Sequence, residues 1–153
     1  MVIKTRCFGE VNIGDEKIIT FDNGLFGFED YKKFTILYNS ETETEKRISW
    51  LQSVEEPALA FPMISPLVVD ETYNPSVQDE VLASLEELTE ENIAMFLIIT
   101  VPSDITKMSA NLKAPIIINS DNRKGVQVVA DNQEYVVKYG IYDIFKNKEG
   151  QPC

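Results

Sequence analysis

The chain has 153 residues, of which 44% are hydrophobic and 25% are charged, and it contains no histidine. This length and composition fit one globular domain and exclude a largely disordered chain. The formal net charge of −11 disfavours binding to nucleic acids and anionic membranes, and the missing histidine removes the commonest general base and metal ligand.

The first part of the chain is predicted to form three strands. Residues 2–10 alternate loosely between apolar and polar, residues 17–21 are rich in β-branched side chains, and residues 34–38 are strand formers. The Asp-Asn-Gly sequence at 22–24 is typical of a turn, because Asn and Gly tolerate positive φ. Residues 40–47 are charged and without periodicity, which indicates an exposed loop.

Two further strands, at 48–53 and 58–64, are predicted before a single helix. Pro62 lies inside the second strand and lacks the N–H that a central strand donates, so we expect an edge position or a bulge there. From Asp79 to Leu88 the sequence DEVLASLEEL follows a helical period. Its apolar residues share one face and predict a short amphipathic helix packed on the core: Val81, Leu82, Leu85 and Leu88.

The last strands follow this helix. Residues 93–101 are the most apolar stretch and are predicted to form a central strand. Residues 114–130 are predicted to form a hairpin with a basic tip, in which Gly125 supplies a left-handed position. Residues 135–145 fit one more strand or an extended tail.

Together these elements predict a mainly β fold, a small antiparallel β-barrel-like domain with one short amphipathic helix. We expect this single domain at residues 1–140 and a partly disordered C-terminal tail at residues 141–153. No apolar run approaches the roughly 18 residues of a membrane span, and the N-terminus lacks the apolar core of a secretory signal. We therefore expect a cytoplasmic protein.

Residues suited to catalysis or to metal binding are sparse. Acidic doublets are adjacent in sequence and point to different sides of a strand or helix, so no metal site and no cofactor is expected. Glu55 and Glu56 could exchange protons with a substrate, but nothing predicts a pocket around them. Arg123 and Lys124 at the hairpin tip could contact a phosphate, although a solvated turn is the simpler interpretation. We predict a protein that is not an enzyme, with a small-ligand-binding or enzymatic β-barrel as the alternative.

The net negative charge lies in one part of the chain, which we call the base-free segment. Residues 48–106 contain 11 acidic side chains and no Lys or Arg, whereas the rest of the chain carries equal numbers of acids and bases. Such a field would attract a basic protein partner, although any single acid could serve solubility alone. Six acids are the candidate partner-binding residues: Glu55, Glu56, Asp70, Glu71, Glu86 and Glu87.

A second candidate surface is apolar. The sequence FPMISP, at 61–66, predicts a strand edge whose backbone cannot pair fully within its own sheet. An edge of that kind can accept a peptide or an element of another protein. Trp50 and Phe61 are alternatively explained as partners across two strands in the core.

Five sequence blocks resemble the FliW family of flagellar assembly factors. They are FDNGLFGFED at 21–30, WLQSVEEPALAF at 50–61, ITVP at 99–102, NLKAPIIIN at 111–119 and KGVQVV at 124–129. The family often has proline where Phe26 stands, and residues 68–73 match only loosely.

This resemblance implies a cytoplasmic, non-enzymatic regulator with a small β-barrel-like fold, a monomer when free. Proteins of the family bind flagellin and CsrA, the RNA-binding repressor of flagellin translation. While CsrA is bound to them it is kept off its RNA. Accumulating flagellin takes these proteins away from CsrA, which then represses again. With this resemblance, we expect the acidic candidates to contact the basic CsrA-type partner, because of their charge. For flagellin, the candidates are Phe61, Pro62 and Met63, or Met108, Asn111 and Leu112.

Overall fold

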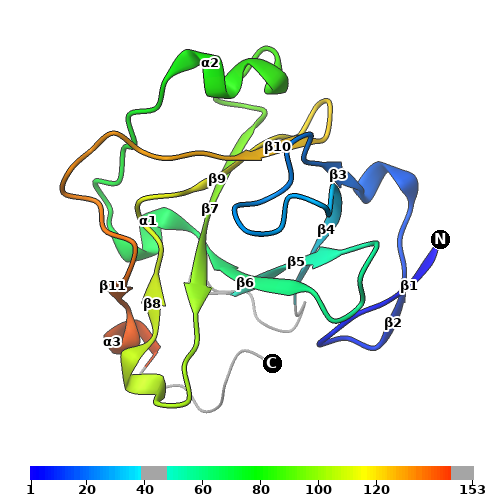
Figure 1. Cartoon of the computed structure of the whole chain (residues 1–153), viewed down its shortest axis with the longest axis horizontal. Coiled ribbons are helices and arrows are strands. Elements are labelled where there is room, and N and C mark those ends of the chain that lie inside the picture. The colour runs from blue at the N-terminus through cyan, green and yellow to red at the C-terminus, as the bar shows by residue number, and fades with distance from the viewer. Residues whose placement is uncertain (39–47, 146–153) are drawn as a thin grey trace.

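The structure is a computed structural model that describes residues 1–38 and 48–145. Its centre is a closed barrel of seven strands, β7-β6-β5-β4-β3-β10-β9, in which β9 pairs back with β7 (Figure 1). Neighbouring strands are antiparallel except β3 and β10, which are parallel and pair Thr20 with Lys124. The predicted β-barrel-like fold is confirmed. The strands are β3 Ile19–Thr20, β4 Lys33–Tyr38, β5 Ser49–Ser53, β6 Ala60–Ile64, β7 Ile93–Thr100, β9 Ile116–Asn119 and β10 Lys124–Gln127.

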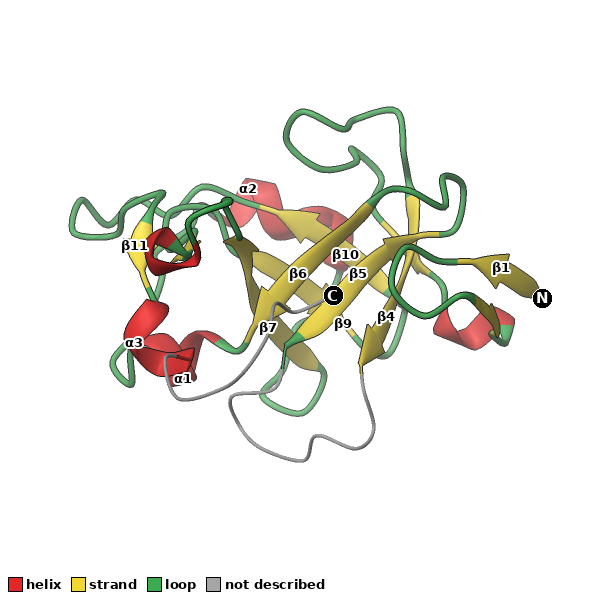
Figure 2. Ribbon diagram, turned by 90° about the horizontal axis from the view of Figure 1, so that it is seen from below, coloured by secondary structure: helices red, strands yellow, loops and turns green. Residues whose placement is uncertain are grey.

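Short elements flank the barrel on two sides. Figure 2 shows α1 and α3 at the end of the molecule opposite the N-terminal strand β1. No helix in the described ranges is long and apolar enough to cross a membrane. The strands are β1 Val2–Lys4, β2 Glu10–Asn12, β8 Ser109–Ala110 and β11 Tyr139–Gly140, and the α-helices are α1 Pro66–Val69, α2 Asp79–Leu82 and α3 Tyr142–Phe145. Three 3-10 turns are η1 Asp15–Lys17, η2 Ala83–Leu85 and η3 Ile105–Lys107.

The predicted amphipathic helix is shorter than its sequence period suggested. It begins at Asp79 as expected, but α2 ends at Leu82, and η2 continues the turn to Leu85. Glu86 then takes a left-handed φ of 63°, which stops the helix before Leu88. Leu85 is fully buried against β9 and β10, whereas Val81 remains 42% exposed. The helices α1 and α3 were not predicted.

The barrel interior is filled by apolar side chains. Phe21, Phe34 and Leu51 are fully buried there, together with Met63 of β6 and Ile116 of β9. Phe21 and Phe34 meet edge to face with ring centroids 5.5 Å apart. These side chains occupy the space in which the alternative of a ligand-binding barrel required a pocket.

A second core cluster extends the packed domain beyond the predicted boundary at residue 140. Ile141 is 1% exposed and packs in the cluster that contains Leu97 and Met108. Ile144 and Phe145 of α3 pack against the same cluster. Residues 141–145 therefore belong to the folded domain, while the predicted disorder of residues 146–153 and the predicted loop at 40–47 lie outside the described residues.

The hairpin at 114–130 is confirmed, but its left-handed residue is not the predicted one. Arg123 has a φ of 57°, whereas Gly125 lies within β10 without a positive φ. Gly125 is required for a different reason: a Cβ atom there would lie 2.6 Å from Cζ of the buried Phe21. The glycine thus lets β10 pass directly over a core aromatic ring.

Candidate partner-binding surface

The six candidate acids lie on three separate turns around the barrel. Glu55 and Glu56 follow β5, Asp70 and Glu71 follow α1, and Glu86 and Glu87 follow η2. In Figure 1, α1 and α2 are joined by the green chain segment along one side of the barrel, and the β5–β6 connection lies apart from both. The structure therefore presents six of the 11 acids of the base-free segment on three acidic turns. It does not gather them into one patch.

The first acidic turn uses one of its two carboxylates for folding. Glu55 Oε1 accepts hydrogen bonds from the backbone N–H groups of Lys32, at 2.8 Å, and Lys33, at 2.9 Å. These bonds, that from Lys33 foremost, hold the pKa of Glu55 below its ordinary value. Ser53 Oγ accepts the N–H groups of Glu55 and Glu56, at 3.1 and 2.9 Å. Glu55 therefore ties this turn to the start of β4.

Replacing Glu55 with alanine is expected to lower the free energy of unfolding by about 1 kcal/mol at neutral pH, because two charge-assisted hydrogen bonds at an exposed site are lost to water. Since folding lowers this pKa, the contribution is present above the unfolded pKa and is lost as the pH falls through the folded value. Urea titrations at pH 7 and at pH 3 measure it. An equal difference between parent and variant at both pH values would contradict this role.

The second acidic turn is anchored in the core by an aromatic residue. Asp70 Oδ1 accepts from the hydroxyl of Thr72, at 2.7 Å, and from its N–H, at 2.9 Å, and these bonds lower the pKa of Asp70. The next residue, Tyr73, is buried and donates its hydroxyl to the Leu112 carbonyl at 2.7 Å. Burial raises the pKa of Tyr73, so it stays a neutral donor. Asp70 shapes the turn, and the exposed Glu71 is the side chain that it presents.

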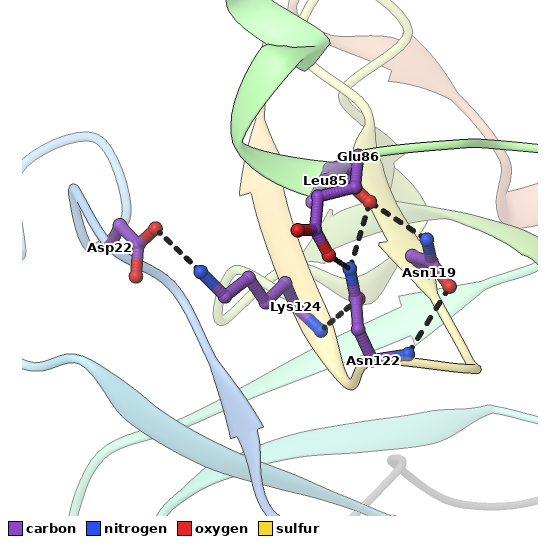
Figure 3. Close-up of polar contacts among 6 residues, drawn as sticks. All are labelled: Asp22, Leu85, Glu86, Asn119, Asn122 and Lys124. Atoms are coloured by element: carbon purple, nitrogen blue, oxygen red, sulfur yellow. Dashed lines mark hydrogen bonds and ion pairs between the residues drawn. The ribbon is translucent and has the colours of Figure 1, made fainter.

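The third acidic turn is held by asparagines of the β9–β10 hairpin (Figure 3). Asn119 Nδ2 donates to the Leu85 carbonyl at 2.7 Å and to the Glu87 carbonyl at 3.2 Å. Asn122 Nδ2 donates to the Leu85 carbonyl at 2.9 Å and to Glu86 Oε2 at 2.8 Å. These bonds satisfy the carbonyl groups that the end of η2 leaves without helical partners. The hairpin therefore fixes the position of the two acids.

A shallow hollow of about 370 Å³ lies beside this turn, and every charged residue that lines it is acidic. Asp121 Oδ2 accepts from Asn92 Nδ2 at 3.1 Å, which fixes a third carboxylate there. The basic tip of the hairpin is directed elsewhere: Lys124 Nζ lies 3.4 Å from Asp22 Oδ2, across the seam with β3 (Figure 3). Lys124 thus forms an ion pair within the protein, which agrees with the interpretation of the tip as a structural hairpin.

The predicted apolar edge is not an edge in the structure. β6 pairs with β5 on one side, where Pro62 faces Trp50, and with β7 on the other, from Met63 to Ile64. Proline is tolerated because the pairing with β7 begins only after Pro62. Met63 is fully buried, whereas Phe61 and Pro62 keep part of their surface accessible. Phe61 also meets the exposed ring of Phe28 edge to face at 5.1 Å.

The second apolar candidate set is also largely inside the protein. Met108 is 5% exposed and Leu112 is 2% exposed, because both pack in the cluster beneath β7 and β8. Asn111 Oδ1 accepts the N–H groups of Lys113 and Ala114, each at 3.0 Å, so its side chain shapes the turn before β9. The apolar side chains of Met108 and Leu112 thus contribute to the packing of this cluster.

Within residues 1–38 and 48–145, no group of three or more Cys, Asp or Glu side chains is arranged to hold a metal ion. In the same ranges, every buried side-chain nitrogen or oxygen atom has a hydrogen-bond partner.

Comparison with known proteins assigns the chain to a family. A family model described as FliW protein matches residues 2–141. A flagellar assembly factor FliW from Lachnoclostridium phytofermentans is 55% identical over 148 residues, which cover 97% of this chain and 95% of the relative. One from Lachnospira eligens is 51% identical over 150 residues, covering 97% and 99%. A crystal structure of the flagellar assembly factor FliW superposes with a TM-score of 0.82 at 34% identity and covers 97% of this chain and 100% of that one. The chain belongs to the FliW family.

Proposed function

We propose that this chain is a cytoplasmic, non-enzymatic flagellar assembly factor that works by binding other proteins. The observation that carries the proposal is its membership of the FliW family over nearly its whole length. The base-free segment supports it independently, because 11 acidic side chains without a neighbouring base in sequence suit a basic partner.

The proposed partners are flagellin and a CsrA-type translational regulator. In this account the free chain holds the regulator off flagellin messenger RNA, and accumulating flagellin takes the chain away so that repression resumes. The acidic surface gives a physical basis for the antagonism. An acidic body docked beside an RNA-binding site repels phosphates and blocks their approach, and it does not need to occupy the RNA site itself.

The regulator is proposed to contact the acidic turns through the carboxylates that folding leaves available. Glu71 and Glu87 are exposed, and no hydrogen bond to either carboxylate is found among the described residues. On the first turn, Glu56 is the proposed contact with the regulator. The carboxylates of Glu55, Asp70 and Glu86 instead accept hydrogen bonds that hold their own turns in place. For flagellin we propose a contact at the accessible part of Phe61 and Pro62, beside Phe28.

The test is charge reversal at the two exposed acids. The double variant Glu71→Lys, Glu87→Lys is expected to bind the regulator about tenfold more weakly at 0.05 M salt, a change of about 1.4 kcal/mol, because each reversal replaces an attraction with a repulsion. Isothermal titration calorimetry measures the affinity. The difference should shrink at 0.5 M salt, where surface charges are screened within roughly 4 Å.

Glu29→Lys is the matched control for the single variants Glu71→Lys and Glu87→Lys, since Glu29 is also exposed and its reversal changes the net charge by the same amount as each of them, outside the base-free segment. It should leave the affinity within about twofold of the parent. Equal losses from the control and from each reversal would mean that only net charge matters. An unchanged affinity of the double variant would contradict a role for these turns.

A further inference from the structure

The barrel closes through a short seam between β3 and β10. Only one pair of residues is in register there, Thr20 with Lys124. On its other side β10 stays paired beyond its last strand residue, since the N–H groups of Val128 and Ala130 donate to Pro115 and Lys113 carbonyls at 3.1 and 2.8 Å. Residues 127–129 therefore run past the end of β3 with a neighbouring strand on one side only, until the N–H of Asp131 donates to the Ser76 carbonyl at 2.7 Å on the other side.

The free side of this extension carries unpaired backbone groups. In an antiparallel pair, alternate residues direct both of their backbone groups to the same neighbour. Because Val128 and Ala130 donate to the β9 side, Gln127 and Val129 direct their N–H and C=O groups away from it. Among the described residues, none forms a hydrogen bond with these groups of Gln127 and Val129. The result is an open strand edge in an otherwise closed barrel.

A groove of about 520 Å³ runs along this edge, between α2 and the loop that follows β3. Its floor is the segment 126–129, and its walls carry two large apolar side chains, Phe26 at 52% exposure and Val81 at 42%. Val129 adds a third at 52%. The Phe26 wall is fixed in place, since its N–H donates to Gln127 Oε1 at 2.9 Å. The groove therefore offers backbone pairing beside pockets for apolar side chains.

The charge of the groove discriminates between possible occupants. Glu80 and Asp131 line it, and none of its lining residues is Lys or Arg. A second copy of this chain would bring the same acids into apposition and would be repelled. A segment with basic side chains next to apolar ones would find complementary partners on both walls.

We propose that this groove binds an extended segment of a partner protein that adds a strand to the free edge of β10 and carries alternating apolar and basic side chains. Strand addition of this type takes its affinity from main-chain hydrogen bonds and its specificity from pockets for alternate side chains. The proposal goes beyond the function given above and does not rest on it, because neither Glu71 nor Glu87 lines the groove.

The experiment uses the full chain, labelled with ¹⁵N, and an eight-residue peptide of alternating valine and lysine with blocked ends. Amide chemical shifts are expected to change mainly at residues 126–129 during the titration. Val129→Pro should weaken binding at least fivefold, because it removes an N–H that has no partner in the part of the chain that the structure describes. Val81→Lys should weaken it by a similar factor through loss of an apolar wall and repulsion of lysine. Ile105→Lys, an equally charged change at an exposed site on η3, should have no effect.

Two altered peptides separate the parts of the proposal. A peptide of the same sequence that is N-methylated at every second residue keeps its side chains but loses one hydrogen-bonding edge, and a peptide of alternating valine and glutamate reverses the charge. Both should fail to shift residues 126–129. The proposal is overturned if either binds as well as the parent peptide, or if Val129→Pro binds normally. It is equally overturned if peptide up to about 1 mM causes no shifts at these residues, or if they shift with protein concentration alone.

Discussion

Replacing Gly125 with alanine should lower the free energy of unfolding by about 2 kcal/mol, and replacing it with valine should lower it further. The added Cβ would lie 2.6 Å from Cζ and 2.7 Å from Cε2 of Phe21, well inside contact distance. Phe21 is fully buried against Phe34 and cannot move without disturbing the barrel interior. For a domain of this size, thermal unfolding of the alanine variant should occur about 4–8 °C below the parent.

A second substitution tests whether Phe21 is the cause. Phe21→Leu removes the ring that meets the added methyl group, so the double variant should be more stable than the sum of the two single losses predicts. Gly140→Ala is the matched control, because nothing lies within 4 Å of a Cβ at that position and its φ is not positive. An alanine at 125 that is as harmless as one at 140 would show that β10 does not depend on close approach to this ring.

Replacing Asn119 with alanine is expected to lower the free energy of unfolding by about 2 kcal/mol, because a buried amide with several partners is lost. Asn119 is 2% exposed, donates to the carbonyls of Leu85 and Glu87, and accepts the N–H of Asp121 at 2.9 Å. The same change should free the third acidic turn and weaken binding of a basic partner. Denaturant titration measures the first effect and calorimetry the second.

The variant Asn119→Asp tests the same hydrogen bonds through the pH dependence of its free energy of unfolding. A carboxylate would face two carbonyl oxygens in a buried site, which raises its pKa and destabilises the fold at neutral pH. As the pH falls below the raised folded value, the protonated carboxyl group can donate again, so the deficit relative to the parent should shrink. Asn23→Ala, at an exposed turn position, should cost less than about 0.5 kcal/mol. A deficit for the Asp variant that is constant with pH would contradict the assigned hydrogen bonds.

The strand pattern and the hairpin were predictable because they depend on local sequence. β-branched and apolar runs mark β4, β7 and β9, and the turn between β9 and β10 is rich in Asn and Ser. The end of the helix was not predictable from its period. Leu88 continues the apolar stripe of the sequence, but tertiary hydrogen bonds from the β9–β10 hairpin take up the carbonyl of Leu85 and end the helix there.

The candidate site was predictable in charge but not in detail. Counting acids identified the base-free segment, yet it could not separate Glu55, whose carboxylate accepts two backbone N–H groups, from the exposed Glu71. The sequence also did not show how deeply the apolar candidates are buried. Met63, Met108 and Leu112 lie in the core, where apolar side chains of this size are commonly found. Proline in β6 indicated an edge, whereas the open edge lies on β10, where no residue type marks it.

A fluorescence assay with three proteins tests the central claim most directly. A CsrA-type regulator is first bound to labelled flagellin leader RNA, and then this chain is added. The account predicts that RNA is released in proportion to the added chain, that subsequent flagellin restores RNA binding, and that the variant Glu71→Lys, Glu87→Lys releases RNA only at about tenfold higher concentration at 0.05 M salt. RNA that remains bound at every concentration of the parent chain, or a release that flagellin cannot reverse, would contradict the account.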